Sequence, residues 1–284
     1  MPSGLWMVCP HADEVIRHIM RKSNPFRFAR SCGVALLSLL SAQAFAASYE
    51  TGYPSISKIS SDLYQALPAK SRAGLTPTPV LMENVAMPFV EPGEHRNGTN
   101  LVRYVSISSG FIDFVNYLSH ARAVDGYERG YYRHYLESLH AEDGRQPLPR
   151  LQLVSDQKGW SFDTMNHQVS HFNQIVAALV AIDMAHHYLG YYSKYSGKLT
   201  DAQNRPVPIN SVLTPAEWRE AVLKGARNAL DCGFGVDGLK ILLESLSTMK
   251  LRPSWSVYFV PDGADVKKIN KELSKLEKDF FLMK

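Results

Sequence analysis

Cysteine is scarce in this chain, with 3 residues among 284. Cys9 and Cys32 precede residue 47, so Cys232 is the single cysteine of the remaining 238 residues. One thiol cannot form an intrachain disulfide. Even in a compartment where disulfides persist, the fold of residues 47–284 must therefore depend on its hydrophobic core.

Long apolar runs are lacking after residue 46, and the run before it is short. Residues 20–30 are basic and contain no acid, and residues 32–46 are largely apolar and end in Ala44-Phe45-Ala46. This order is typical of a cleavable signal peptide, and the run is shorter than the roughly 20 residues that span a bilayer. We expect translation to start at Met20, cleavage to follow Ala46, and the mature protein to be periplasmic or secreted without a membrane span.

An excess of charge of one sign is also missing once this leader is removed. Residues 47–284 contain 26 basic and 25 acidic side chains, a net charge of +1, although the whole chain carries +4. The basic character of the chain therefore belongs mostly to residues 1–46. A nearly neutral domain gives no electrostatic reason to expect a nucleic-acid partner.

Motifs for nucleophilic catalysis and for phosphate binding are absent as well. No Gly-x-Ser-x-Gly segment occurs in the sequence, and Cys232 falls at a predicted helix end. Gly233-Phe234-Gly235 follows no predicted strand, which a phosphate-binding loop requires. The sequence thus gives no reason to expect a serine hydrolase or a nucleotide-binding enzyme.

Helical periodicity dominates what is present. LVRYVSIS at 101–108 is rich in β-branched and aromatic residues and predicts a strand. Helices are expected at 111–124, 129–140, 165–192, 214–232, 236–249 and 266–280, with a short strand at 255–261. Thr214, Pro215 and Glu217 form a capping box with proline at the first helical position. Residues 47–98 are expected to be irregular apart from a helix near 60–67, and residues 142–163 to form a loop. The pattern predicts an α+β fold, mostly helical with a small antiparallel or mixed sheet.

The segment 165–192 is apolar around most of its circumference, which is typical of a helix buried in the middle of a domain. Asp183 lies within it, with His186 at i+3 and His187 at i+4 on the same face. A carboxylate in such surroundings is costly unless it is paired. Two interpretations follow: a carboxyl–imidazole pair that stabilises the core, or part of a functional site.

The order of these segments resembles the gluzincin metallopeptidases related to the CAAX prenyl protease and the HtpX-like heat-shock proteases. The resemblance covers residues 101–249: strand LVRYVSIS, helix FIDFVNYL, helix NQIVAALVAIDMAHHYLGYY, then EWREAVLKGARNALDCGFGVDGLKILLESL. Residues 116–165 stand out as an insertion. The resemblance implies a metallopeptidase-like domain over 99–284 that follows an N-terminal segment at 47–98.

The zinc motif of that family is degenerate here. In His-Glu-x-x-His, two histidines at i and i+4 bind zinc and the glutamate acts as general base. On this alignment Ile182 takes the first histidine position, Asp183 the general-base position and His186 the second histidine position. The third ligand falls on Trp218 and its supporting acid on Val222. One of three expected ligands remains, whereas a catalytic zinc needs three protein ligands.

Three functions remain open from the sequence. The first is a pseudo-peptidase with no cofactor, which binds a polypeptide or a cell-envelope protein in the inherited groove by strand addition. The second is an active metallopeptidase whose zinc is held by Asp183, by His186 or His187, and by Glu220. The third is a di-metal helical protein, because Glu137-x-x-His140 and Asp183-x-x-His186 both have the carboxylate-x-x-histidine spacing of di-iron bundles.

Overall fold

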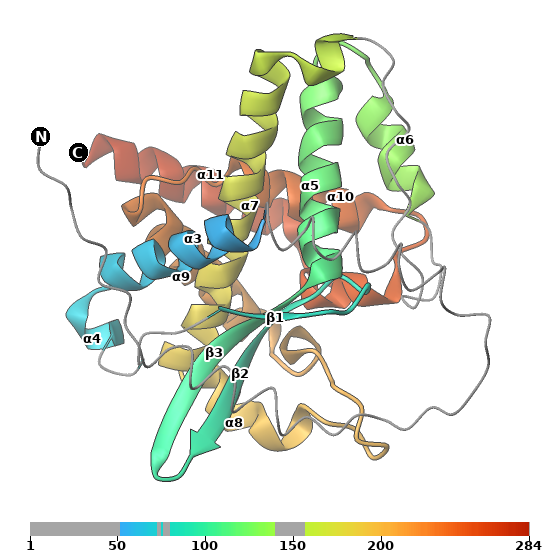
Figure 1. Cartoon of the computed structure of the whole chain (residues 1–284). Helices are drawn as coiled ribbons and strands as arrows, with labels where there is room; N and C mark the ends of the chain where they lie inside the picture. The colour runs from blue at the N-terminus through green and yellow to red at the C-terminus, as the bar shows by residue number, and fades with distance from the viewer. Residues whose placement is uncertain (1–51, 73–74, 76–79, 140–156, 284) are drawn as a thin grey trace, which may run out of the picture. The chain divides into compact units, whose positions relative to one another are not determined.

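The computed structural model describes residues 52–72, 75, 80–139 and 157–283, and Figure 1 shows their arrangement. The expected leader, with Met20 and Ala46, lies outside the described residues. The elements, in chain order, are α3 (Tyr53–Ala66), α4 (Ala69–Arg72), β1 (Val80–Glu83), β2 (Val90–Asn97), β3 (Asn100–Ser108), α5 (Ser109–Val124), α6 (Tyr131–Ser138), α7 (Phe162–Tyr188), α8 (Tyr191–Tyr195), α9 (Pro215–Asp231), α10 (Asp237–Thr248) and α11 (Val266–Leu282), with 3-10 turns η1 (Gln157–Trp160), η2 (Ser196–Lys198), η3 (Ile209–Ser211) and η4 (Ser254–Tyr258). The fold is α+β, with a helical core and a small mixed sheet, as the sequence predicts.

The sheet is three-stranded, in the order β1-β3-β2. β1 runs parallel to β3, and β2 runs antiparallel to it in a hairpin that closes on Asn97 and Asn100. Gly98 has a φ of 61°, a backbone conformation that favours glycine in a tight hairpin turn. β3 leads directly into α5, where the Ser108 hydroxyl accepts the Phe111 N–H and caps the helix.

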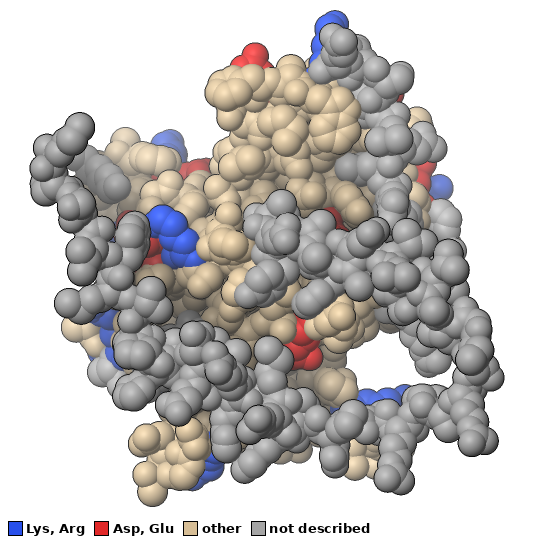
Figure 2. Space-filling model, in the orientation of Figure 1, with Lys and Arg blue, Asp and Glu red and all other residues tan. Residues whose placement is uncertain are grey.

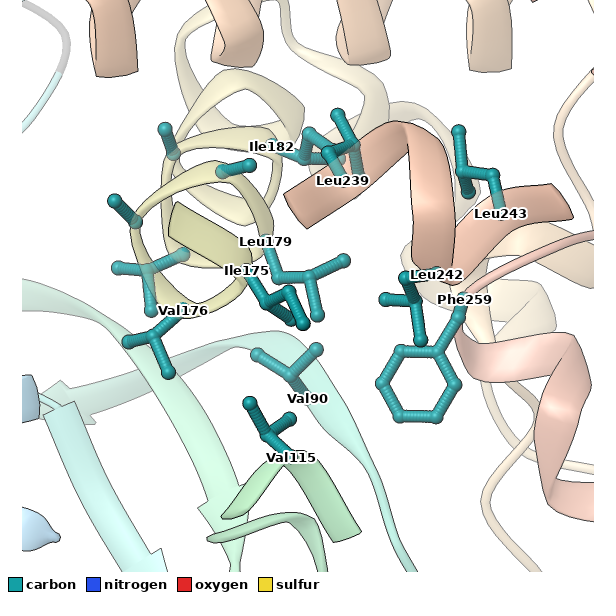
Figure 3. Packing of buried hydrophobic residues seen from close by; sticks show 14 of the residues in the cluster. Val90, Val115, Ile175, Val176, Leu179, Ile182, Leu239, Leu242, Leu243 and Phe259 are labelled. Carbon is teal, nitrogen blue, oxygen red and sulfur yellow. The ribbon is translucent and has the colours of Figure 1, made fainter. Parts of the chain in front are cut away.

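Helix α7 is the centre of the core. Its N-terminus is capped by the Ser161 hydroxyl, and every residue from Ile175 to His187 is buried. It contacts α3, α5, α9, α10 and the β2–β3 hairpin. Figure 3 shows Ile175, Leu179 and Ile182 of this helix packed with side chains of β2, α5 and α10. Helices on several sides explain why its sequence is apolar nearly all round.

Helices α9 and α11 follow their sequence signals closely. The capping box at the start of α9 is present in both directions: Thr214 accepts the Glu217 N–H, and Glu217 accepts the Thr214 N–H. In α11, the apolar side chains at 266, 269, 273 and 280 are buried in the common core. These side chains, three, four and seven positions apart, form one apolar stripe of the helix that packs within this chain.

The N-terminal segment differs from the sequence prediction. The expectation of irregular structure over 47–98 is wrong for the described part, which contains α3, α4, β1 and β2. The first of these is longer than predicted and buries Ile56, Ile59 and Leu63 in the common core. β2 was not predicted because it contains proline and glycine. Its position at the edge of the sheet is compatible with the proline.

Two other expectations are also corrected. Residues 255–261 do not form a strand. Ser254–Tyr258 is a 3-10 turn that turns Trp255 and Phe259 toward the same aromatic partner, Phe114, with ring centroids 4.9 Å and 5.9 Å away. The long helix ends at Tyr188 rather than Tyr192, because Gly190 has a φ of 79°, which stops the helix as a left-handed cap.

Two further expectations concern a membrane span and the distribution of charge. None of their helices combines the length and the apolar run that a membrane crossing needs. On the face shown in Figure 2, basic and acidic residues that are not grey are interspersed rather than gathered by sign. The absence of a nucleic-acid partner stays a prediction.

Candidate functional site

The carboxyl and imidazole groups singled out in the sequence lie in the last turns of α7. Asp183 is 4% exposed, His186 is 0% exposed and His187 is 5% exposed. The packing of α9 and the β2–β3 hairpin against α7 removes these side chains from solvent. A group that acts on a substrate must touch it, and none of these three presents a surface for that contact.

Asp183 and His186 are neighbours but do not form a hydrogen bond. The Asp183 Oδ1 and His186 Nε2 atoms are 3.9 Å apart, beyond hydrogen-bond range. Burial raises the pKa of Asp183 well above its usual range. Burial, with a smaller contribution from His187, lowers the pKa of His186 to about 3. Both groups are therefore favoured in their neutral forms, and the pair is not an ion pair.

His187 connects the helix to the hairpin. Its Nε2 lies 3.2 Å from the carbonyl oxygen of Tyr104, so this nitrogen carries the proton and donates it to that carbonyl. Its Nδ1 lies 3.9 Å from Glu94 Oε1, and Glu94 accepts a hydrogen bond from Arg103 at 3.1 Å. Burial lowers the pKa of His187 to about 4. This histidine joins α7 to β3 and lies beside Glu94 of β2.

Several polar atoms of this cluster have no partner among the described residues. They are Asp183 Oδ2, both ring nitrogens of His186, and His187 Nδ1. Buried polar atoms without hydrogen bonds are destabilising. The cluster therefore reduces the stability of the fold, unlike the satisfied carboxyl–imidazole pair that the sequence suggested.

A second carboxyl group, which sequence reasoning missed, belongs to the same cluster. Burial and the charge of Asp183 raise the pKa of Glu91 well above its usual range. The Ile209 N–H donates to both of its carboxyl oxygens, at 3.3 Å and 3.2 Å, which opposes that shift. Glu91 lies in β2, and the Asn97-Gly98 dipeptide is the sequence signal that would have revealed the hairpin.

Glu220 lies outside this buried cluster. It is exposed on α9 and accepts a hydrogen bond from the Tyr191 hydroxyl at 2.6 Å. The Tyr191 ring in turn lies 6.4 Å from the His186 ring, centroid to centroid. The proposed metal ligand is thus brought toward His186 only through an intervening tyrosine.

The side chains at the expected zinc positions do not fit a zinc ion. Ile182 has no donor atom and packs against α9 so closely that a Cβ on Gly225 would lie 2.6 Å from its backbone nitrogen. Trp218, 3% exposed, carries only an indole N–H, which cannot ligate a cation. Across the described residues, no three His, Cys, Asp or Glu side chains are grouped so that they could hold a metal ion.

The residues of the di-metal hypothesis are not all described. Glu137 is exposed on α6, His140 lies outside the described residues, and Asp183 and His186 are buried in α7. Glu137 also lines a groove on the surface, whereas Asp183 and His186 do not. The described residues of the two motifs are therefore not brought together in a way that would let them share a pair of metals.

The edge of β2 has few free backbone donors for strand addition. The bond from the Ser108 N–H to the Phe89 carbonyl and the hairpin register turn residues 90, 92, 94 and 96 away from β3. Pro92 has no N–H to offer, and the Glu94 N–H bonds to the Tyr192 side chain. Proline on the outward side is a common way to protect an edge. This edge is therefore poorly suited to the strand addition that the sequence suggested.

Comparisons of the chain with protein-family models, curated proteins and solved structures gave no match. The resemblance to gluzincin metallopeptidases stays a prediction from the motifs.

Proposed function

We propose that this protein is an exported polypeptide-binding protein built on a metallopeptidase-like scaffold, and that it does not hydrolyse peptides by zinc catalysis. The observation that carries the proposal is the contact between Ile182 and Gly225. On the alignment that the resemblance implies, helix-to-helix packing occupies the position where the peptidases that the chain resembles place their first zinc ligand. Hydrolysis would require a metal ligand at this position and access for a substrate.

The surroundings of the contact support the same conclusion. His186, the one retained ligand position, has no exposed surface. Asp183, at the general-base position, has its pKa raised by burial and so is disfavoured as the carboxylate that would accept a proton from water. A metallopeptidase-like scaffold without these catalytic groups keeps polypeptide binding as its remaining function, at a surface other than the protected edge of β2.

The test is to incubate the full chain with fluorescein-labelled β-casein, an unfolded polypeptide, with and without added zinc. We expect complex formation by fluorescence anisotropy and intact casein on gels. Asp183→Asn is the matched control, because it removes the acid at the general-base position with almost no change of shape. Zinc-dependent cleavage by the wild type that disappears in Asp183→Asn would overturn the proposal in favour of an active metallopeptidase.

A further inference from the structure

A groove of about 820 Å³ lies between α6 and α10. Its volume is in the range of ligand-binding clefts. One wall comes from the end of α5 and from α6, with Arg122, Tyr132 and Leu136. The other comes from α10 and the residues after it, with Ile241 and Leu251. None of the side chains of the buried cluster on α7 lines it.

Hydrogen bonds across the floor of the groove join its two walls. The Tyr132 hydroxyl lies within hydrogen-bond distance of Ser245 Oγ, and Ser245 donates to the Ile241 carbonyl at 2.6 Å. Since the serine proton is used in that bond, the tyrosine is the donor between them. Burial raises the pKa of Tyr132 to about 12, so its hydroxyl stays protonated and the two walls remain joined.

The rim of the groove carries an apolar residue that folding does not explain. Leu251 is 64% exposed, yet it lies beside Met249, which packs on the core, and opposite Leu136. An exposed leucine next to an apolar concave surface is favourable in a complex, where it leaves water, and contributes little to the free chain.

The charged side chains of the rim have both signs. Arg133 and Lys250 are basic, Glu137 and Glu244 are acidic, and all four are exposed. None of them forms an ion pair with another described residue. A rim with both signs is complementary to a segment that also carries both, and an aliphatic floor is complementary to aliphatic side chains.

We propose that the groove between α6 and α10 is the polypeptide-binding site, and that it takes a segment with aliphatic side chains and charged residues of both signs. This inference rests on the proposed function and names its site. The proposed binding site is distinct from the degenerate zinc motif and from the protected edge of β2.

The experiment measures the affinity of the full chain for fluorescein-labelled β-casein in three variants. Leu251→Asp places a charge on the apolar rim, and we expect about tenfold weaker binding because an apolar contact becomes a desolvated carboxylate. Thr248→Trp fills the groove from an exposed position on α10 without changing charge, and we expect a similar loss. Leu282→Asp is the matched control, since Leu282 is 74% exposed and lies outside the groove.

The outcomes distinguish failure of the proposed groove from failure of the proposed function. Weaker binding by the two groove variants, with the control unchanged, supports the groove. Equal affinity in all variants overturns the groove and leaves the proposed function standing. Equal loss in the control also overturns it, because binding would then depend on exposed apolar residues in general. No binding by the wild type overturns the proposed function and the groove with it.

Discussion

The buried cluster at the end of α7 and the open groove between α6 and α10 are opposites in where they place polar and apolar groups. In the cluster, Asp183 and His186 are buried with atoms that lack partners. In the groove, Leu251 is exposed. The first arrangement lowers stability and admits no ligand, and the second costs little and is accessible. Resemblance to an enzyme motif therefore directs attention to the region less able to meet a partner.

The largest expected effect comes from disrupting the contact between Ile182 and Gly225, which closes the cluster. Gly225→Val should lower the free energy of unfolding by about 3 kcal/mol, because a Cβ at this position would meet the backbone of Ile182 at 2.6 Å. Urea denaturation measures this loss. Gly197→Ala is the control, since nothing lies within 4 Å of a Cβ there, and it should change stability by less than about 0.5 kcal/mol. A small loss for Gly225→Val would mean that α7 and α9 separate easily enough to admit a ligand.

Restoring the zinc motif provides the next test. Ile182→His should destabilise the fold by about 2 kcal/mol, because an imidazole would be buried without a partner. It should not raise the zinc content of the purified chain, measured by mass spectrometry. Ile182→Val is the conservative control and should cost about 1 kcal/mol. One equivalent of tightly bound zinc in Ile182→His would show that the motif is closer to a working site than its packing implies.

The pH dependence of stability separates the acids of the cluster from its histidines. His186 and His187 have folded pKa values lowered from 6.5 to about 3 and about 4. Their contribution to the free energy of unfolding is complete above pH 6.5, and it is lost as the pH falls toward those folded pKa values. Asp183 and Glu91 have raised pKa values. Their contribution is complete below their ordinary pKa values of 3.8 and 4.5 and is lost as the pH rises through their folded values.

These contributions oppose one another in the wild type between the ordinary pKa values of the acids and of the histidines. Asp183→Asn removes one acid, so we expect it to be more stable than the wild type near pH 7. As the pH falls from 6.5 toward 4.5, it should also lose stability more steeply, by about 1.4 kcal/mol per pH unit. Denaturation curves over this range measure the slope. A variant that tracks the wild type at every pH would show that Asp183 is ionised in the fold.

The helical part of the fold could be predicted from the sequence because its signals are local. The capping box at Thr214 and the helix at 266–280 depend only on neighbouring residues, and both are present as predicted. The β2 strand was missed because Pro92 and Gly93 normally break strands. Pro92 is tolerated on the outward edge, where its missing N–H removes no bond to β3. Gly93 leaves room for the Tyr104 ring, since a Cβ there would lie 2.3 Å from that ring and the tyrosine side chain would have to move.

The candidate site was only partly predictable. Asp183, His186 and His187 were found because they share one helix face, which periodicity reveals. Glu91 belongs to a strand that the sequence pattern hid. The contact between Ile182 and Gly225 joins two helices across 43 positions of the chain, and no local pattern encodes such a distance. Tertiary packing decides which acids and which helices come into contact. It also decides where the groove beside α10 lies.

The smallest expected effect concerns the stability of the groove variants. Leu251→Asp should leave the free energy of unfolding within about 0.5 kcal/mol of the wild type, because the leucine already faces water. Leu246→Ala, on the buried side of α10 with 0% exposure, should cost about 3 kcal/mol through the cavity it creates. Thermal and urea denaturation would measure both. If Leu251→Asp destabilised the chain as strongly as Leu246→Ala, its side chain would belong to the core of the free protein, and weaker casein binding by this variant would report unfolding rather than a lost contact.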